Sequence, residues 1–186
     1  MQLKQYNLTF SRLTKEYLEL VRGWRNSEPI NQWMIYRKNI SSEEQLEWFN
    51  NLDSNTNYYF IVNHKQQRIG LMNIKDINWQ DKTGEPGGFI IEQHYLGTLV
   101  PALCLLMMFD FAFYHLGLSE LQGKVLETNS ASLNCNLELG GIIASTENGI
   151  CRIVHSKQNY QHASARYRDA ARALYPESES QFYITA

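Results

Sequence analysis

Aromatic, thioether and cationic side chains gather in the N-terminal third of the chain, and their types suit a ring-bearing ligand. Trp33, Met34 and Tyr36 lie close together, and Trp48 follows in the next predicted helix. Such side chains stack on a base such as uracil or pack against the face of a hexose. Arg25 can hold a diphosphate, because a guanidinium pairs with phosphate through two parallel hydrogen bonds. These five residues are candidate contacts to a substrate.

Three of these residues also have an ordinary structural interpretation. Trp33 and Trp48 fall at helical spacing, which is typical of core positions. Arg25, like its neighbours Arg22 and Arg37, is of a type that is most often a surface charge. The composition is compatible with both interpretations, since aromatic residues make up 12% of the chain. An aromatic surplus can fill a core or line a pocket.

Apolar periodicity and turn residues predict the elements that would position these side chains. The chain is expected to alternate between helices and strands within one mixed α/β domain. A loop is expected at 84–87, and the long apolar helix at 99–115 should end at Gly117. The predicted strands are 3–10, 58–62, 68–74, 88–91, 120–126, 142–144 and 150–154, with a further strand possible at 181–184. The other predicted helices span 17–24, 30–34, 42–52, 129–139 and 163–174. Ser41 or Ser42 should start the helix at 42–52, with Glu44 or Gln45 in capping-box position.

Charge and cysteine content exclude several classes of protein. A net charge of −2 gives no electrostatic reason to expect nucleic acid or an anionic membrane as a partner. The segment from Leu96 to Phe109 is apolar, but it is too short to span a bilayer and contains Pro101. Three widely spaced cysteines without zinc-ligand spacing predict free thiols and no metal. We therefore expect a cytoplasmic protein.

Two local motifs then point to a family. The segment Ile91-Glu92-Gln93-His94-Tyr95-Leu96-Gly97 resembles the strand-to-helix crossing V-x-P-x-Y-R-G of GNAT acetyltransferases. Asn129-Ser130-Ala131-Ser132 with Leu139-Gly140-Gly141 resembles their N-x-x-A/S…L-G-F segment. This resemblance implies an α/β (α+β) GNAT fold, in which a single mixed, mostly antiparallel sheet with splayed central strands is flanked by helices. It places the acyltransferase domain at 1–155, with 156–186 as a C-terminal extension packed on the same domain.

The N-terminal segments narrow the resemblance to one branch of the family. Residues 21–27, 33–34, 40–45 and 48–49 are similar to enzymes that acetylate nucleotide-linked amino sugars or the N-termini of ribosomal proteins. The resemblance implies acetyl transfer from acetyl-CoA to the amine of a small molecule, with a sugar nucleotide as the expected acceptor. The alternatives are an N-terminal peptide acetyltransferase and a GNAT-like binding protein without turnover. A homodimer is possible.

The same resemblance implies where the acyl donor would bind. Main-chain amides near Ile90 and Ile91 would hold the pantetheine arm, and residues 96–101 would surround the pyrophosphate. Gly97, Thr98, Leu99 and Val100 are therefore expected cofactor contacts, with Asn129 and Ser132 on the neighbouring helix. Leu99 and Pro101 replace the two glycines of the usual loop. Asn129 is also expected to cap its helix.

Proton transfer has several candidates under this resemblance. Glu92 and His94 follow the fourth family strand and could accept the proton of the amine, with Glu85 in reserve. An ordered water could also suffice, because an amino-sugar amine titrates low. Asn136 stands where relatives carry a tyrosine, and an amide cannot supply a proton. The general acid is thus left unassigned.

Overall fold

Nine strands of the described residues form one sheet at the centre of the protein. A computed structural model describes residues 1–91, 93–95 and 97–185. The order across the sheet is β7-β8-β6-β5-β4-β3-β2-β1-β9, and every pair is antiparallel except β5–β6. The strands are β1 (Gln2–Gln5), β2 (Leu8–Arg12), β3 (Tyr58–His64), β4 (Gln67–Asn78), β5 (Thr83–Ile90), β6 (Glu120–Leu126), β7 (Ile142–Glu147), β8 (Ile150–Ser156) and β9 (Tyr183–Thr185). The predicted mixed, mostly antiparallel sheet is confirmed.

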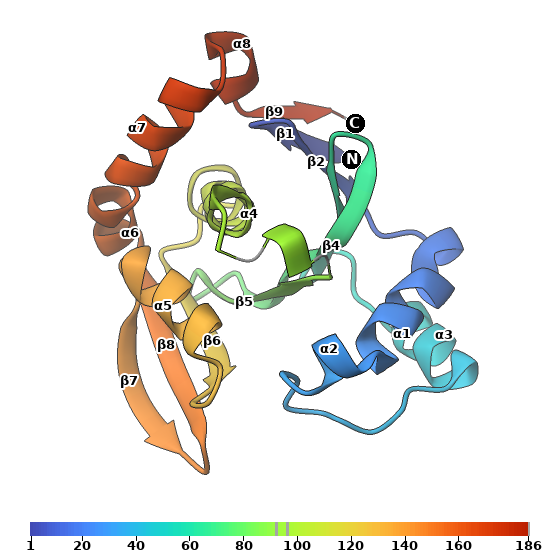
Figure 1. The fold of residues 1–186 in the computed structure, drawn as a ribbon. Helices are drawn as coiled ribbons and strands as arrows, with labels where there is room; N and C mark the ends of the chain where they lie inside the picture. The colour runs from blue at the N-terminus through green and yellow to red at the C-terminus, as the bar shows by residue number, and fades with distance from the viewer. Residues whose placement is uncertain (92, 96, 186) are drawn as a thin grey trace.

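The helices cover both faces of this sheet (Figure 1). In Figure 1 the sheet curves around α4, while α1 and α3 lie on the opposite side of β4. The α-helices are α1 (Leu18–Asn26), α2 (Glu28–Asn31), α3 (Ser42–Asn50), α4 (Leu99–Asp110), α5 (Ser130–Glu138), α6 (Lys157–Ala163), α7 (Ala165–Leu174) and α8 (Glu177–Ser180). Short 3₁₀ turns η1 (Lys15–Tyr17) and η2 (Gln93–Tyr95) and a π-helical turn η3 (Phe111–His115) complete the set.

Alternation along the central strands produces a separate apolar cluster on each face. Phe60 and Val62 of β3 join the main core around α4. Ile61, between them, joins a second cluster with Val21 of α1, and Trp48 of α3 packs against it. The serine-started helix was predicted with a capping box, and Ser41 and Glu44 form one at the start of α3. The face toward α4 is thus a closed apolar core, whereas the face toward α1 and α3 is only partly covered by helices.

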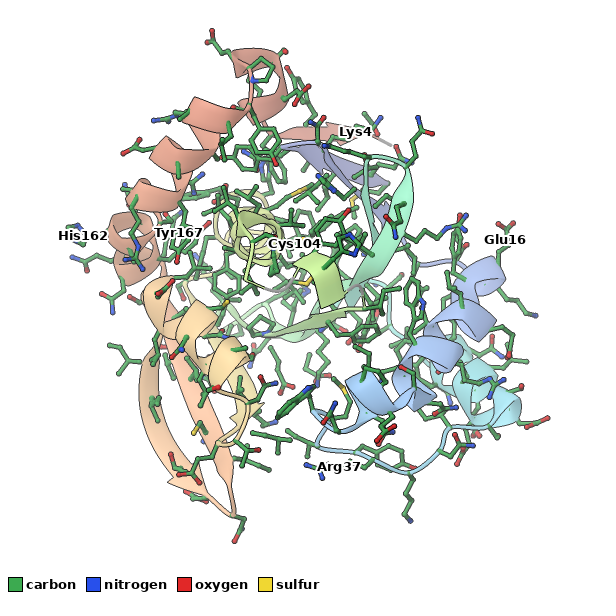
Figure 2. The ribbon with its side chains drawn as sticks, in the orientation of Figure 1. Lys4, Glu16, Arg37, Cys104, His162 and Tyr167 are labelled. Carbon is green, nitrogen blue, oxygen red and sulfur yellow. The ribbon has the colours of Figure 1, made fainter. Side chains whose placement is uncertain are left out.

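The predicted helix at 99–115 is confirmed, with a change of pitch near its end. It runs as α4 and then as η3, and Gly117 follows with a φ of +73°. Cys104 lies at the centre of the packed side chains in Figure 2 and is fully buried. All three cysteines are unpaired, as predicted. In the part of the chain that the structure describes, no helix is long and apolar enough to cross a membrane.

Two predictions of local structure were wrong. The expected strand at 3–10 is a hairpin, since Tyr6 and Asn7 both take positive φ values (54° and 59°) and turn the chain between β1 and β2. The expected loop at 84–87 is part of strand β5. Glycine and proline suggested a turn there, but Glu85, Pro86 and Gly87 pair in register with β4. Tertiary pairing overrides the local preference at 84–87, whereas a two-residue turn at Tyr6 and Asn7 reverses the chain locally.

The C-terminal segment joins the same sheet and the same core. Strand β9 pairs with β1, which places the last strand at the edge of the sheet. Tyr160 of α6 is fully buried in the main core, where its hydroxyl donates to Asp110 Oδ1 at 2.6 Å. Arg168 of α7 forms an ion pair with the same carboxylate, with 2.8 Å between Nη1 and Oδ2. This buried network connects α6 and α7 to the central helix α4.

Candidate active site

The two central strands of the sheet separate soon after they meet. Strand β5 pairs with β6 only at Thr83–Glu120 and Gly84–Leu121. The ladder then stops at Pro86, which has no N–H to donate. A proline at this position explains the separation, because its side of the strand is the one that would bond to β6. The predicted splayed strands are therefore present, and their origin is local.

Main-chain direction identifies which amides face this gap. The amide of Ile91 donates to the carbonyl of Ile69 on β4 at 2.8 Å. Because amides alternate between the two edges of a strand, those of Ile90 and Gly88 point toward β6. The prediction that Ile91 offers a free amide was thus wrong, since β4 already uses it. Ile90 is the better candidate donor of the predicted pair.

A cavity of about 430 Å³ lies on the face of β5 that α1 and α3 cover, opposite the face that packs on α4. Arg25, Met34, Tyr36 and Trp48, all predicted substrate contacts, line it together. Trp48 packs edge-on against Tyr59, with ring centroids 5.0 Å apart. The remaining lining residues are Val21, Ile40, Glu44, Gln45, Tyr59, Leu71, Asn73, Lys75, Gly87, Gly88 and Phe89. Segment 34–40 thus forms one wall and strand β5 another.

Trp33 does not take part in this cavity. It is 40% exposed and is not among the described residues that line the cavity, although its neighbour Met34 is. Because side chains of consecutive residues diverge at the end of a short helix, one of the pair had to face away. The prediction that Trp33 contacts substrate finds no support in the geometry. Arg37, labelled in Figure 2, also lies on the exposed outside of this segment.

Two hydrogen-bond donors in the cavity wall lack partners among the described residues. Nη1 of Arg25 is enclosed without an acceptor, and burial lowers the pKa of this guanidinium. Nδ2 of Asn73 is likewise enclosed without an acceptor, although the residue is only 6% exposed. An unpaired buried donor costs on the order of 1–3 kcal/mol. A ligand that supplies oxygen atoms here would remove that cost.

The first turn of α4 departs from the predicted cofactor loop. Thr98 caps the helix: its Oγ1 accepts from the Val100 amide at 3.3 Å and donates to the Tyr95 carbonyl at 2.7 Å. Both predicted phosphate donors are therefore already used within the turn, which corrects that expectation. Leu99 packs partly against the main core, so its side chain is turned inward. Gly97 has a φ of +80°, and a Cβ added there would meet no described atom within 4 Å, which leaves space at the loop.

Helix α5 shows the predicted cap and explains the unusual Asn136. Asn129 accepts from the Ser132 amide at 3.1 Å, which confirms the capping role. The side-chain amide of Asn136 donates to the Ser132 carbonyl at 2.8 Å, and the residue is buried. Its own carbonyl is hydrogen-bonded to His155 Nε2 at 3.1 Å. Asn136 is thus held by its own helix and by β8, and it has a structural role in place of an acid.

Of the two main candidate bases, the structure describes His94. Glu92 lies outside the described residues, as does Leu96. His94 is exposed, and the centroids of its ring and the Tyr95 ring are 4.1 Å apart. Tyr95 in turn forms a 2.9 Å hydrogen bond with His64 Nδ1, which fastens η2 to the end of β3. His94 therefore sits on an anchored turn just after β5.

Glu85 is an ion-pair partner and a poor base. Lys75 on β4 and Lys124 on β6 each contact its carboxylate at 2.9 Å. Burial works against the charged form, but hydrogen bonds from the two lysines outweigh it and hold the pKa of Glu85 below its usual value. The carboxylate thus connects β4 to β6 across β5, close to where the strands separate.

We predict that Glu85→Gln leaves the pH dependence of acetyl transfer unchanged. The amide keeps the shape of the side chain and loses one member of the ion pairs, so kcat/KM should fall by less than about tenfold. A pH–rate profile from about pH 6 to 9 measures this. Loss of the acidic limb of the profile would instead make Glu85 the base. Glu120→Gln, a partly buried glutamate on β6, is the matched control.

Sequence reasoning missed Asn73, Tyr59 and two glycines of β5, Gly87 and Gly88, as parts of the cavity. A polar residue within the apolar run 69–74 was one available signal. Consecutive glycines in a strand were another, because they often mark a close approach of ligand to backbone. Burial raises the pKa of Tyr59 to about 12, so this phenol stays protonated. It can donate a hydrogen bond at neutral pH.

Metal chemistry has no candidate ligand set here. Residues 1–91, 93–95 and 97–185 contain no group of three or more His, Cys, Asp or Glu side chains placed to hold an ion.

Comparison with known proteins agrees with this geometry. The chain is 35% identical over 69 residues to the acetyltransferase PseH of Campylobacter jejuni, a match that covers 37% of this chain and 43% of that protein. The chain thus spans less than half the length of this curated relative. The apo structure of FdhC, described as a nucleotide-linked sugar GNAT, superposes with a TM-score of 0.76 at 20% identity, covering 90% of this chain and 96% of FdhC.

A second solved structure supports the same fold. Spermidine N-acetyltransferase from Vibrio cholerae, in complex with CoA and spermine, superposes with a TM-score of 0.74 at 20% identity, covering 83% of this chain and 98% of that one. The family described as "Acetyltransferase (GNAT) domain" matches residues 7–141. With that match over most of the chain and the separated β5–β6 pair at its centre, this protein belongs to the GNAT acetyltransferase family.

Proposed function

We propose that the protein transfers an acetyl group from acetyl-CoA to the amine of a nucleotide-linked amino sugar. The observation that carries this proposal is the position of β5, which turns the amides of Ile90 and Gly88 toward the gap to β6 and lines, on one face, an aromatic cavity where Arg25 Nη1 has no acceptor among the described residues. Donor and acceptor would then meet at a single strand. The unpaired thiols and the use of acetyl-CoA support a cytoplasmic location.

The reaction places modest demands on the protein. The lone pair of the neutral amine forms a bond to the thioester carbonyl carbon, the C–S bond breaks, and its electrons leave with the sulfur. The proton lost by nitrogen ends on the thiolate or on water. The amide at Gly88 would stabilise the oxyanion that forms in between. His94, Glu92 or an ordered water would take the proton.

The acyl donor would enter between β5 and β6. Ile90 supplies a main-chain donor for the pantetheine arm, and the loop at Gly97 and Leu99 lies at the start of α4, where a helix N-terminus favours phosphate. Thr98 and Val100 would have to exchange their internal hydrogen bond for one to the ligand. Asn129 and Ser132 begin α5, the helix after β6. These residues remain the proposed cofactor contacts.

The acceptor would occupy the cavity under α1 and α3. Trp48, Tyr36 and Met34 offer surfaces for a base or sugar ring, and Arg25 offers a charge for a diphosphate. A polyamine would need carboxylates, yet of the described residues that line the cavity Glu44 alone is acidic, and it is engaged in the capping box. An N-terminal peptide would need an open groove, whereas segment 34–40 forms a wall here. Both features favour the sugar nucleotide.

Mass spectrometry of the products tests the proposal. The purified chain is incubated with acetyl-CoA and, separately, with UDP- and dTDP-amino sugars, a peptide with a free N-terminus, and spermidine. We expect a gain of one acetyl group on an amino-sugar nucleotide. Acetylation of the peptide or of spermidine in its place would contradict the acceptor. Absence of heat when acetyl-CoA is titrated into the protein at millimolar concentration would favour a binding protein without turnover.

Arg25→Met is expected to weaken binding of the sugar nucleotide. The variant keeps the apolar stem but removes the charge, so KM for the nucleotide should rise roughly tenfold to a hundredfold while KM for acetyl-CoA stays constant. Steady-state kinetics with each substrate varied in turn measures both constants. Arg152→Met on β8, whose guanidinium donates to Gln122, is the matched control and should change neither. Equal loss in both variants would place the diphosphate elsewhere.

A further inference from the structure

Asn73 is an unusual residue at its place in the sheet. It lies in the middle of β4, between Met72 and Ile74, which are both buried in the main core. Alternation turns Asn73 to the other face, where it lines the acceptor cavity between Leu71 and Lys75. It is 6% exposed, and its Nδ2 has no acceptor among the described residues. A buried amide without a partner is rare in proteins and commonly marks a functional group.

The neighbouring strand makes room for this amide. Asn73 pairs in register with Gly87 of β5. A Cβ atom at Gly87 would lie 3.0 Å from Asn73 Oδ1 and 3.2 Å from Nδ2, closer than packed side chains normally approach. The absence of a side chain at Gly87 therefore lets the amide lie against β5. Gly88, whose amide faces the gap to β6, is the next residue.

Asn73 and Arg25, whose side chains each carry a donor without a partner among the described residues, lie on different sides of the cavity. Arg25 projects from helix α1, which covers the cavity, whereas Asn73 belongs to the sheet that forms its floor. The floor is the part of the cavity closest to the strand edge where the acyl group would be held. An acceptor with its amine directed at that edge would thus bring its neighbouring substituents to Asn73. Its charged end would face Arg25.

We infer that Asn73 determines acceptor specificity by donating a hydrogen bond to an oxygen substituent next to the reacting amine. This inference rests on the proposed function and adds a requirement to it. The acceptor must carry a hydroxyl, carbonyl or ring oxygen beside its amine, as an amino sugar does and a polyamine does not. An amine without such an oxygen leaves the buried amide unpaired, and sites of this kind discriminate strongly against it.

Kinetics of three variants with three amines test the inference. The variants are Asn73→Leu, which removes the amide, Asn73→Asp, which turns the donor into an acceptor, and Asn63→Asp as a control on β3. Asn63 is partly buried, and its Nδ2 already donates to the Thr9 carbonyl. The amines are a UDP-amino sugar that the wild-type protein acetylates, the same amino sugar without its nucleotide, and cyclohexylamine. All assays contain acetyl-CoA.

The expected kinetic pattern would place the oxygen atom that accepts from Asn73 on the sugar and not on the nucleotide. Asn73→Leu should lower kcat/KM roughly tenfold to a hundredfold for both sugars and leave cyclohexylamine unchanged. A loss confined to the nucleotide-linked sugar would mean that Asn73 contacts the diphosphate and would overturn the inference. Equal loss with all three amines would do the same. Asn63→Asp should match the wild-type protein.

Two further measurements distinguish a specificity role from a structural one. Thermal unfolding should show Asn73→Leu at least as stable as the wild-type protein, because it removes an unpaired buried amide. A fall in Tm of more than about 4 °C would show that the amide is a structural requirement.

For Asn73→Asp, activity relative to wild type should rise as pH is lowered from about 8 to 6, because a protonated carboxyl regains a donor. A flat ratio would contradict a donor role.

Failure of the inference and failure of the proposed function give different results. Wild-type turnover of the amino sugars together with an unaffected Asn73→Leu variant would remove the inference and leave the function standing. A wild-type protein that acetylates none of the three amines would remove both.

Discussion

Gly88→Ala is expected to reduce kcat for acetyl transfer by at least about a hundredfold, because a side chain at this position moves the strand edge that should grip the acyl group. Gly88 has a φ of +151°, and a Cβ there would lie 2.5 Å from both the Leu71 carbonyl oxygen and the Met72 sulfur. The carbonyl belongs to the backbone of β4 and cannot yield without a shift of the β4–β5 pair. Transfer between bound reactants is sensitive to displacements on the order of 1 Å.

Gly123→Ala provides the matched control for this variant. Gly123 lies on β6, on the far side of the gap, and the nearest atom to its Cβ position is Pro86 Cγ at 3.6 Å, an ordinary contact. We expect this variant to retain activity within about threefold, well under the hundredfold loss that a displaced reacting centre causes. Single-turnover kinetics with saturating acetyl-CoA isolates the chemical step. Normal turnover by Gly88→Ala would mean that the unpaired edge of β5 does not hold the reacting thioester.

Arg168→Met is expected to produce the largest loss of stability. The guanidinium contacts Asp110, whose side chain is only 7% exposed, and the Tyr160 hydroxyl donates to the same carboxylate. Removing one partner of a buried ion pair leaves an uncompensated charge and costs about 3–5 kcal/mol. For a chain of this size each kcal/mol lowers Tm by roughly 2–4 °C. Thermal unfolding followed by circular dichroism measures the shift.

Two controls separate the buried pair from surface charge. Arg172→Met, on the same helix, breaks an exposed ion pair with Asp169 and should change Tm very little. The double variant Asp110→Leu/Arg168→Met should be more stable than Arg168→Met alone, because it leaves no unpaired charge behind. If Arg168→Met unfolds at the wild-type temperature, α7 is not fastened to α4 through this carboxylate.

Local signals in the sequence were sufficient for several elements that surround the site. Strand β6 was predicted at its observed limits, and α5 was predicted from the cap at Asn129 and the glycines that follow Leu139. The capping box at Ser41 and Glu44 likewise formed as expected. Caps and apolar periodicity depend on residues within a few positions of one another, so one sequence contains the information. The family resemblance was carried in part by two of these segments, 129–141 and 40–45.

Tertiary structure alone decided which groups are available at the site. Ile91 and Val100 were predicted to offer amides, but Ile69 and Thr98 accept from them, and neither pairing follows from local pattern. The residues at 84–87 read as a turn and became a strand because β4 pairs with them. Asn73 reached the cavity through the register that sets it opposite Gly87. Strand register depends on contacts distant in sequence, so the sequence determined which elements form, while their pairing determined which donors stay free.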